Sequence, residues 1–165
     1  MTPPVRVLTA ADAAAFRDIR LAGLADDPRA FSADLGAEST QDLDWFAARI
    51  AGNRIFAVDG EAGQLLGITG LAIPQNPKQR HRGHIWGVYV RPGARGSGIA
   101  TALLAAAIGA ARGEVEMLHL GVGTYNDSAR RRYRAAGFVE TGFEARALRI
   151  GDEFIDEITM TLTLP

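Results

Sequence analysis

The chain has 165 residues, of which 47% are hydrophobic and 22% are charged. These proportions are ordinary for a folded globular protein and exclude a disordered or fibrous one. The length suits a single domain over residues 1–165 that buries its own core. The sequence has no cysteine, which excludes disulfides, thiolate metal ligands and a cysteine nucleophile, and its net charge of −1 gives no general attraction to nucleic acid.

Neither the amino terminus nor any internal segment predicts export or membrane insertion. Residues 1–6 lack the apolar core of a signal peptide, and the longest apolar stretch, residues 99–111, is too short to span a bilayer. We therefore expect a cytoplasmic protein with no membrane, nucleic-acid or metal partner.

The amino-terminal third of the chain predicts two helices. A short strand is expected at residues 5–8, followed by a helix that Thr9 or Asp12 caps and that has apolar residues at helical spacing. A proline and a glycine break residues 25–40, which predicts an irregular segment. The second helix is expected over residues 41–50.

The remaining elements alternate between strands and helices. We predict helices over residues 99–112 and 127–136, and strands over residues 54–58, 65–73, 84–90, 117–122, 138–150 and 154–164. In the last strand apolar residues alternate with threonines, a period of two that buries one face. This order predicts a mixed α/β sheet with helices on both faces. Two strand–helix–strand crossovers imply parallel strands at its centre, where a ligand cleft can open.

A glycine loop lies between the strand that ends at Val90 and the helix that starts at Ile99. Gly96 and Gly98 allow the backbone to turn tightly and to approach a ligand without obstruction by a Cβ atom. The first N–H groups of the helix have no intrahelical partner and carry partial positive charge, and Arg95 adds a full cation. Phosphate is the natural ligand for such a site.

The residues after Gly98 narrow the choice of phosphate ligand. A P-loop requires Lys and then Ser or Thr there, whereas this sequence has Ile99 and Ala100. A dinucleotide-binding fingerprint requires three glycines in register, and this loop has two. The pattern Arg95-x-x-Gly98-x-Ala100, within the run VYVRPGARGSGIATALL, instead resembles the acetyl-CoA site of the GCN5-related N-acetyltransferase (GNAT) superfamily.

A second motif strengthens this resemblance. Asn126, Ala129, Tyr133 and the pair Gly137-Phe138 have the spacing of the second GNAT signature. The order of elements is also similar over essentially the whole chain. The resemblance implies an α/β (mixed α+β) fold, with a central, mostly antiparallel twisted sheet of six to seven strands and about four helices on both faces.

The resemblance also implies how acetyl-CoA is held. The backbone of Val88, Tyr89 and Val90 would bond to the pantetheine arm, and the amide near Val88 would face the thioester carbonyl, where a donor stabilises the developing oxyanion. Asn126 would bind the pantetheine or a catalytic water, unless it only caps a helix. The pyrophosphate would be held by the loop residues Arg95, Gly96, Ser97, Gly98, Ile99, Ala100 and Thr101.

Tyr133 takes the place of the family's usual general acid, which protonates the departing thiolate; the alternative is a ring that only packs under the sheet. A base for the amine is harder to assign, because the strand HIWGVYV has no carboxylate, and family members carry a bulge here that breaks its side-chain alternation. His84 on this strand and Glu38 in the acceptor wall are the two candidates. The alternative for His84 is a position at a strand edge beside solvent, and the alternative for Glu38 is a solvated acid in a loop.

The resemblance implies that residues 25–44 border the acceptor cleft. This segment is acidic, which favours a cationic amine, although helix caps and solvated turns also explain its acids. We expect acetyl transfer from acetyl-CoA to a primary amine of a small molecule or peptide, by direct attack in a ternary complex. One alternative is a non-catalytic acyl-CoA-binding module that acts as a sensor or partner domain. Another is an ATP-binding protein, for which the sequence offers no magnesium ligand set near the glycines. A homodimer is compatible with each of these functions.

Overall fold

The computed structural model describes residues 2–165. Seven strands form one mostly antiparallel sheet in the order β1-β2-β3-β4-β5-β7-β6. The strands are β1 (Arg6–Val7), β2 (Arg54–Asp59), β3 (Leu65–Ala72), β4 (Arg82–Val90), β5 (Met117–Gly123), β6 (Val139–Ile150) and β7 (Glu153–Thr163). The helices are α1 (Ala13–Asp26), α2 (Leu35–Ser39), α3 (Leu43–Gly52), α4 (Ile99–Ala111) and α5 (Asp127–Ala135). This architecture confirms the predicted fold class.

The segment between α1 and α3 is more regular than its sequence predicts. It contains the 3-10 helix η2 (Pro28–Ala30) and the short helix α2, which Asp34 caps by accepting a hydrogen bond of 2.8 Å from the amide of Ala37. The prediction of an irregular segment was therefore wrong for α2. A helix of only five residues is too short to show apolar periodicity, so its capping residue is its main local signal.

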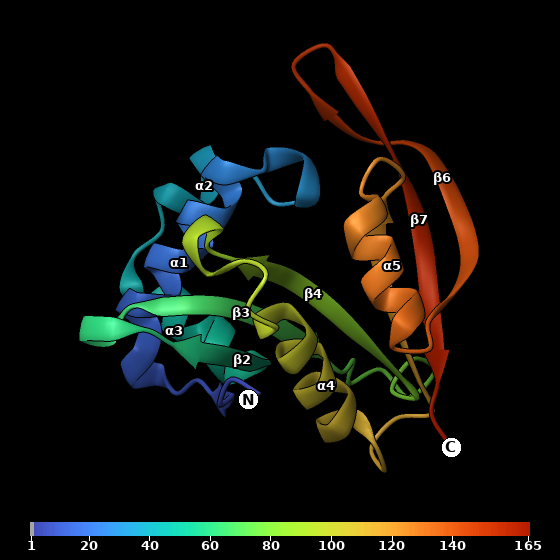
Figure 1. Ribbon diagram of the computed structural model, residues 1–165, viewed down its shortest axis with the longest axis horizontal. Coiled ribbons are helices and arrows are strands. Elements are labelled where there is room, and N and C mark those ends of the chain that lie inside the picture. Colours follow the sequence, from blue (N-terminus) through green and yellow to red (C-terminus); the bar gives the residue numbers. More distant parts are fainter. Residues whose placement is uncertain (1) are drawn as a thin grey trace.

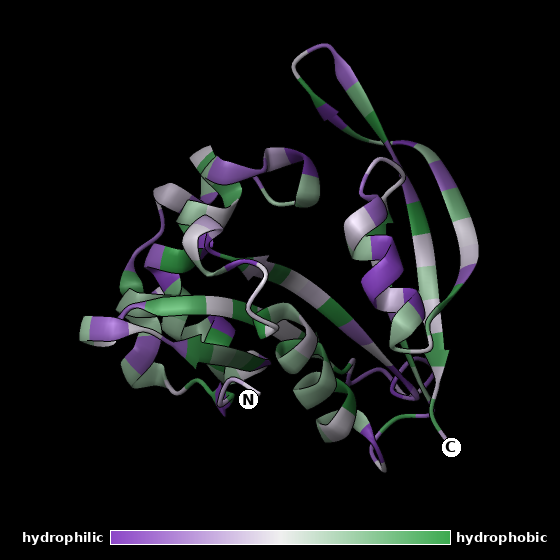
Figure 2. Cartoon of the chain, in the orientation of Figure 1, coloured by the Kyte–Doolittle hydropathy of each residue, from purple (hydrophilic) through white to green (hydrophobic). Residues whose placement is uncertain are grey.

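The helices cover both faces of the sheet (Figure 1). On one face α1 and α3 pack on β2 and β3 through a buried cluster that includes Phe16, Phe46 and Ile68. On the other face α4 and α5 pack on the sheet through a second cluster that includes Leu103 and Met160. Figure 2 shows α4 as mainly hydrophobic and α5 as largely hydrophilic. Within residues 2–165 no helix is both long and apolar enough to cross a membrane.

The sheet separates between its two central strands. β4 and β5 are parallel and pair over only three positions, from Arg82 opposite Met117 to His84 opposite His119. Beyond that point the half with β1–β4 and the half with β5–β7 diverge, as Figure 1 shows. The predicted parallel pair at the sheet centre is thus confirmed, and it forms the closed end of a V-shaped opening.

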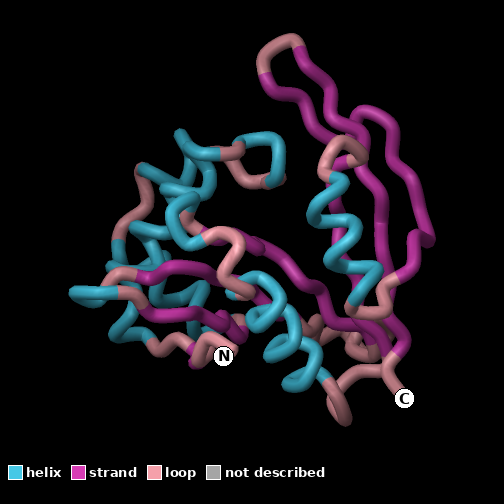
Figure 3. The backbone as a smooth tube through the Cα atoms, viewed as in Figure 1, coloured by secondary structure: helices cyan, strands magenta, loops and turns pink. Residues whose placement is uncertain are grey.

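The second strand–helix–strand crossover does not place its strands side by side. After α5 the chain forms β6 at the sheet edge, and β7 returns to lie between β5 and β6, antiparallel to both (Figure 3). β5 and β6 are therefore not neighbours, contrary to the expected second parallel pair. The buried residues Ile158 and Met160 explain this order, because β7 has the stronger apolar face and takes the interior position.

Candidate active site

The opening between β4 and β5 contains a cavity of about 590 Å³. Its walls come from β4, the glycine loop and first turn of α4, β5, the start of α5, and the segment around η2. Ile99 and Tyr133 line it on the side of α4 and α5, and Phe31 and Trp86 line it on the side of α1. The cavity therefore passes through the sheet, so that two reactants can meet in it from opposite faces.

A bulge in β4 decides which residues face each side. The register with β3 shifts opposite Gly87, whose φ of 64° lies in the left-handed region that favours glycine. Trp86 and Tyr89 consequently face α1, while Val88 and Val90 pack toward α4. β4 makes no ladder pairs with β5 beyond its first three residues, so the backbone of residues 88–90 borders the cavity, as predicted for the pantetheine site.

The glycine loop presents the open N-terminus of α4 to the cavity. Gly96 and Gly98 have φ values of 76° and 84°, and Gly98 is the N-cap, with no side chain to satisfy the first helical amides. The first intrahelical bond runs from the amide of Ala102 to the carbonyl of Gly98. The amides of residues 99–101 are therefore the groups that α4 offers to an anion.

Arg95 does not serve the loop as a free cation. Its Nη2 lies 2.6 Å from a carboxylate oxygen of Asp26, and its Nε donates to the carbonyl of Val90 at 3.0 Å. The expected cation is thus neutralised by Asp26, although Arg95 still lines the cavity. The Ser97 hydroxyl donates to the carbonyl of Ala94, and Ser97 is not among the lining residues. The free donors at the loop are therefore main-chain amides rather than these two side chains.

Tyr133 lies on α5 with only 6% of its surface exposed, and it lines the cavity. Burial raises the pKa of its phenol from 10.0 to about 12, because a phenolate would lose its hydration there. The ring also packs edge-on against Phe138, with centroids 6.0 Å apart. Tyr133 is therefore a packed core residue that also lines the cavity with its phenol protonated, and its role as general acid stays a prediction.

Comparison with known proteins decides the family. Residues 21–138 match the sequence profile described as "Acetyltransferase (GNAT) family". The chain belongs to the GNAT acetyltransferase family. This match confirms the resemblance that the two motifs predicted, and it spans the glycine loop, Asn126 and Tyr133.

Solved structures agree with this GNAT assignment. A GNAT-family acetyltransferase from Streptococcus pneumoniae is 23% identical, with a TM-score of 0.87 over 98% of this chain and 99% of its own. A ribosomal-protein-alanine N-acetyltransferase from Brucella melitensis is 26% identical, with a TM-score of 0.80 over 98% and 99%. A phosphinothricin acetyltransferase from Sinorhizobium meliloti, in complex with acetyl-CoA, is 23% identical, with a TM-score of 0.81 over 99% and 89%. No curated protein sequence matched.

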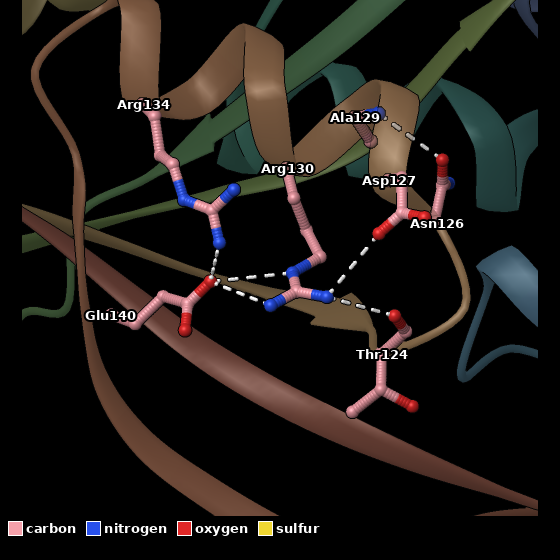
Figure 4. A network of polar contacts seen from close by, with 7 residues as sticks. All are labelled: Thr124, Asn126, Asp127, Ala129, Arg130, Arg134 and Glu140. Carbon is pink, nitrogen blue, oxygen red and sulfur yellow. Dashed lines mark hydrogen bonds and ion pairs between the residues drawn. The ribbon is translucent and has the colours of Figure 1, made fainter.

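Asn126 caps α5 of this GNAT protein, as one of its two predicted roles required. Its Oδ1 accepts a hydrogen bond of 3.1 Å from the amide of Ala129, and the residue also lines the cavity. Figure 4 shows this cap beside a network in which Arg130 and Arg134 both bind Glu140. The cap uses one lone pair of the amide oxygen, and the amide nitrogen makes no hydrogen bond within residues 2–165.

Glu38 is not a free base. It is buried, and its two carboxylate oxygens each accept a 3.0 Å bond from Arg20, one from Nε and one from Nη2. The predicted base is therefore held in a two-point ion pair and is not among the lining residues of the cavity. The sequence alone predicted a loop at Glu38, because it showed neither the helix α2 nor that Arg20 of α1 bonds to this carboxylate.

His84 lies at the closed end of the V and is not among the lining residues of the cavity. Its ring lies 4.6 Å from that of His119, the residue paired with it on β5. Burial lowers the pKa of His84. The nearby charge of Arg82 also lowers this pKa, whereas a hydrogen bond with the backbone of His119 raises it. The half-buried position corrects the expectation of a solvent-facing strand edge and places this predicted base away from the cavity.

Two residues near the cavity escaped prediction. Glu157 of β7 reaches across to Gly121, and the ring of Tyr125 covers Gly123; both glycines line the cavity. The alternation of β7 could have placed Glu157 on the face opposite Ile158, but only the pairing of β7 with β5 brings it to the opening.

Proposed function

We propose that this GNAT protein transfers the acetyl group of acetyl-CoA to a primary amine of a small molecule or peptide, by direct attack in a ternary complex. One observation carries the proposal: a single cavity joins the free amides of α4, the unpaired edge of β4 and the buried hydroxyl of Tyr133. These are the groups needed for an anionic cofactor tail, an extended arm and a leaving thiolate.

The donor half of the cavity fits acetyl-CoA. The amides of residues 99–101 would bind the pyrophosphate, and the backbone of residues 88–90 would bond to the pantetheine arm as an added strand does. The amide near Val88, at the bulge that Gly87 creates, would donate to the thioester oxygen. When bound, acetyl-CoA supplies the activated acetyl group.

Tyr133 would protonate the departing sulfur. Its raised pKa keeps the phenol protonated at neutral pH, so the proton is present before the reaction begins. With no cysteine in the chain, transfer through a cysteinyl acyl-enzyme is excluded, which favours direct attack by the amine.

A non-catalytic acyl-CoA-binding module is the second candidate, and the absence of a carboxylate on β4 favours it. Such a module would need the loop and the edge of β4 but not a proton donor beside the thiolate site. The position of Tyr133 on the cavity wall weighs toward the enzyme.

Two measurements test the proposed function. Acetyl-CoA should raise the melting temperature of the protein, whereas ATP and NAD should not. Wild-type protein should then release free thiol from acetyl-CoA faster with some members of a panel of primary amines than without them. Binding without amine-dependent release would contradict the enzyme and support the binding module.

A further inference from the structure

Glu157 projects from β7 toward β5 and places its carboxylate beside Gly121, which lines the cavity, whereas Glu157 itself is not among the lining residues. Its Cα is paired with Gly123 of β5, yet its Oε2 lies 3.1 Å from the position that a Cβ atom would take at Gly121. The side chain therefore runs along β5 toward the closed end of the V. Its neighbour Ile158 is buried in the cluster under α5, so Glu157 lies on the opposite face, the side from which Trp86 lines the cavity.

The carboxylate of Glu157 is half-buried and has no cation of its own. Within residues 2–165 no hydrogen bond or ion pair engages it, whereas Glu38 and Glu140 are each held by arginines. Burial raises its pKa, and the negative charge of Glu144, directly opposite on β6, raises it further. A carboxylate left in this condition gains from a cationic ligand.

The surroundings of Glu157 suit an ammonium group. The hydroxyl of Tyr125 is buried without a hydrogen-bond partner among the described residues, and Phe31 and Trp86 line the cavity on the same side of the sheet. One cation is near: Arg29, whose guanidinium lies 4.3 Å from the ring centroid of Tyr125. The ionisable groups around this end of the cavity are Glu144 on β6, Glu153 on β7, Tyr125 after β5, and Asp27 and Arg29 beside η2.

We propose that Glu157 binds the ammonium group of the acceptor and removes its proton before attack, which makes it the base that β4 does not provide. This inference rests on the proposed acetyl transfer. It assigns the acceptor class as amines that are cationic in solution. An amine with a pKa of roughly 10 is almost wholly protonated at neutral pH and cannot attack until a base takes that proton.

Protons and electrons balance in this reaction with Glu157, Tyr133 and solvent water. Glu157 takes one proton from the ammonium and later releases it to water. The freed nitrogen lone pair forms the C–N bond, and the C–S bond breaks with its electron pair on sulfur. The second proton leaves the nitrogen as the amide forms, and Tyr133 delivers a proton to the sulfur and is reprotonated in turn.

The test compares Glu157→Gln with the wild-type protein and with Glu144→Gln, a matched control on the neighbouring strand of the same hairpin. Each variant is first checked for thermal stabilisation by acetyl-CoA, which shows that it is folded and binds the donor. For the best acceptor of the amine panel we expect kcat/KM to fall at least about 100-fold in Glu157→Gln and less than about threefold in Glu144→Gln.

The pH profile separates a base from a structural residue. With Glu157 present, kcat/KM should reach a plateau well below the pKa of the amine. Without Glu157 only the unprotonated fraction of the amine can react, so kcat/KM should rise roughly tenfold per pH unit up to the pKa of the amine. A fluorinated, less basic analogue of the same acceptor should also be much less affected by the substitution.

Three outcomes overturn the inference. Glu157→Gln with a wild-type plateau and a wild-type rate would exclude Glu157 while leaving the acetyl transfer intact. An equal loss in Glu144→Gln would assign the effect to the charge of the hairpin rather than to Glu157. A wild-type protein that binds acetyl-CoA and acetylates no amine would overturn the proposed function and this inference together.

Discussion

Arg20 and Glu38 form a buried ion pair in which both carboxylate oxygens are bonded at 3.0 Å. The guanidinium also lies 5.4 Å from the ring centroids of Phe31 and Trp86, two residues that line the cavity. Its Nη1 is 3.2 Å from the Cβ position of Gly87, at the bulge of β4. This pair therefore links α1 and α2 to the strand that shapes the site, and its role is to position that strand.

Glu38→Gln should destabilise the protein without removing a catalytic base. Leaving the guanidinium of Arg20 buried without its partner is expected to cost about 3 kcal/mol of unfolding free energy, measured by urea denaturation. The pH at which kcat/KM reaches its plateau should not move. A plateau that shifts while the stability is unchanged would indicate that Glu38 is a catalytic base.

Tyr133→Phe should slow acetyl transfer while preserving donor binding. The substitution keeps the packing of the ring on Phe138 and removes the hydroxyl beside the cavity. We expect kcat to fall about 100-fold, with the Kd for acetyl-CoA within about threefold of wild type by calorimetry. An unchanged kcat would leave Tyr133 with its packing role alone.

Tyr133 should also make stability fall at high pH. Because its folded pKa is about 12 against 10.0 in the unfolded chain, its contribution is complete below pH 10 and is lost as the pH rises through 12. At pH 11 the loss should be about 1 kcal/mol relative to pH 8. The Tyr133→Phe variant should not show this part of the loss. Parallel curves of unfolding free energy against pH for the two proteins would refute the prediction.

His119 should stay neutral well into the acid range. Burial, together with the nearby His84 and Arg82, lowers its pKa from 6.5 to about 4. A depressed pKa means that its contribution to stability is complete above pH 6.5 and is lost as the pH falls through 4. The imidazole resonance should titrate near pH 4 in NMR spectra; a midpoint near 6.5 would contradict the burial of His119 beside His84.

Gly98→Val should weaken acetyl-CoA binding. A side chain at a φ of 84° is strained by about 1 to 2 kcal/mol, and its methyl groups would stand beside the amides that α4 offers to phosphate. The Kd should rise at least about tenfold. Gly93→Ala is the matched control, because Gly93 has no positive φ and open space at its Cβ position. Equal effects of the two substitutions would argue against the loop as the anion site.

Local patterns were enough to predict most elements and the donor half of the site. The alternation of apolar residues with threonines marks β7, and the glycines before Ile99 mark the start of α4, because both signals act within a few residues of chain. The two motifs also identified the family. The short helix α2 was missed, and the side chain of Arg95 was given a ligand role although Asp26 holds it.

The acceptor half was decided by tertiary structure alone. Glu38 is not a free base because Arg20 reaches it from another helix. Glu157 lies beside the cavity-lining Gly121 because β7 lies beside β5 instead of at the sheet edge. Periodicity shows which face of a strand a residue occupies, but strand order depends on how distant apolar faces are buried together. The sequence by itself thus determined the family and the motifs on which the proposed donor site rests, and only the packing of the sheet decided which carboxylate lies beside Gly121.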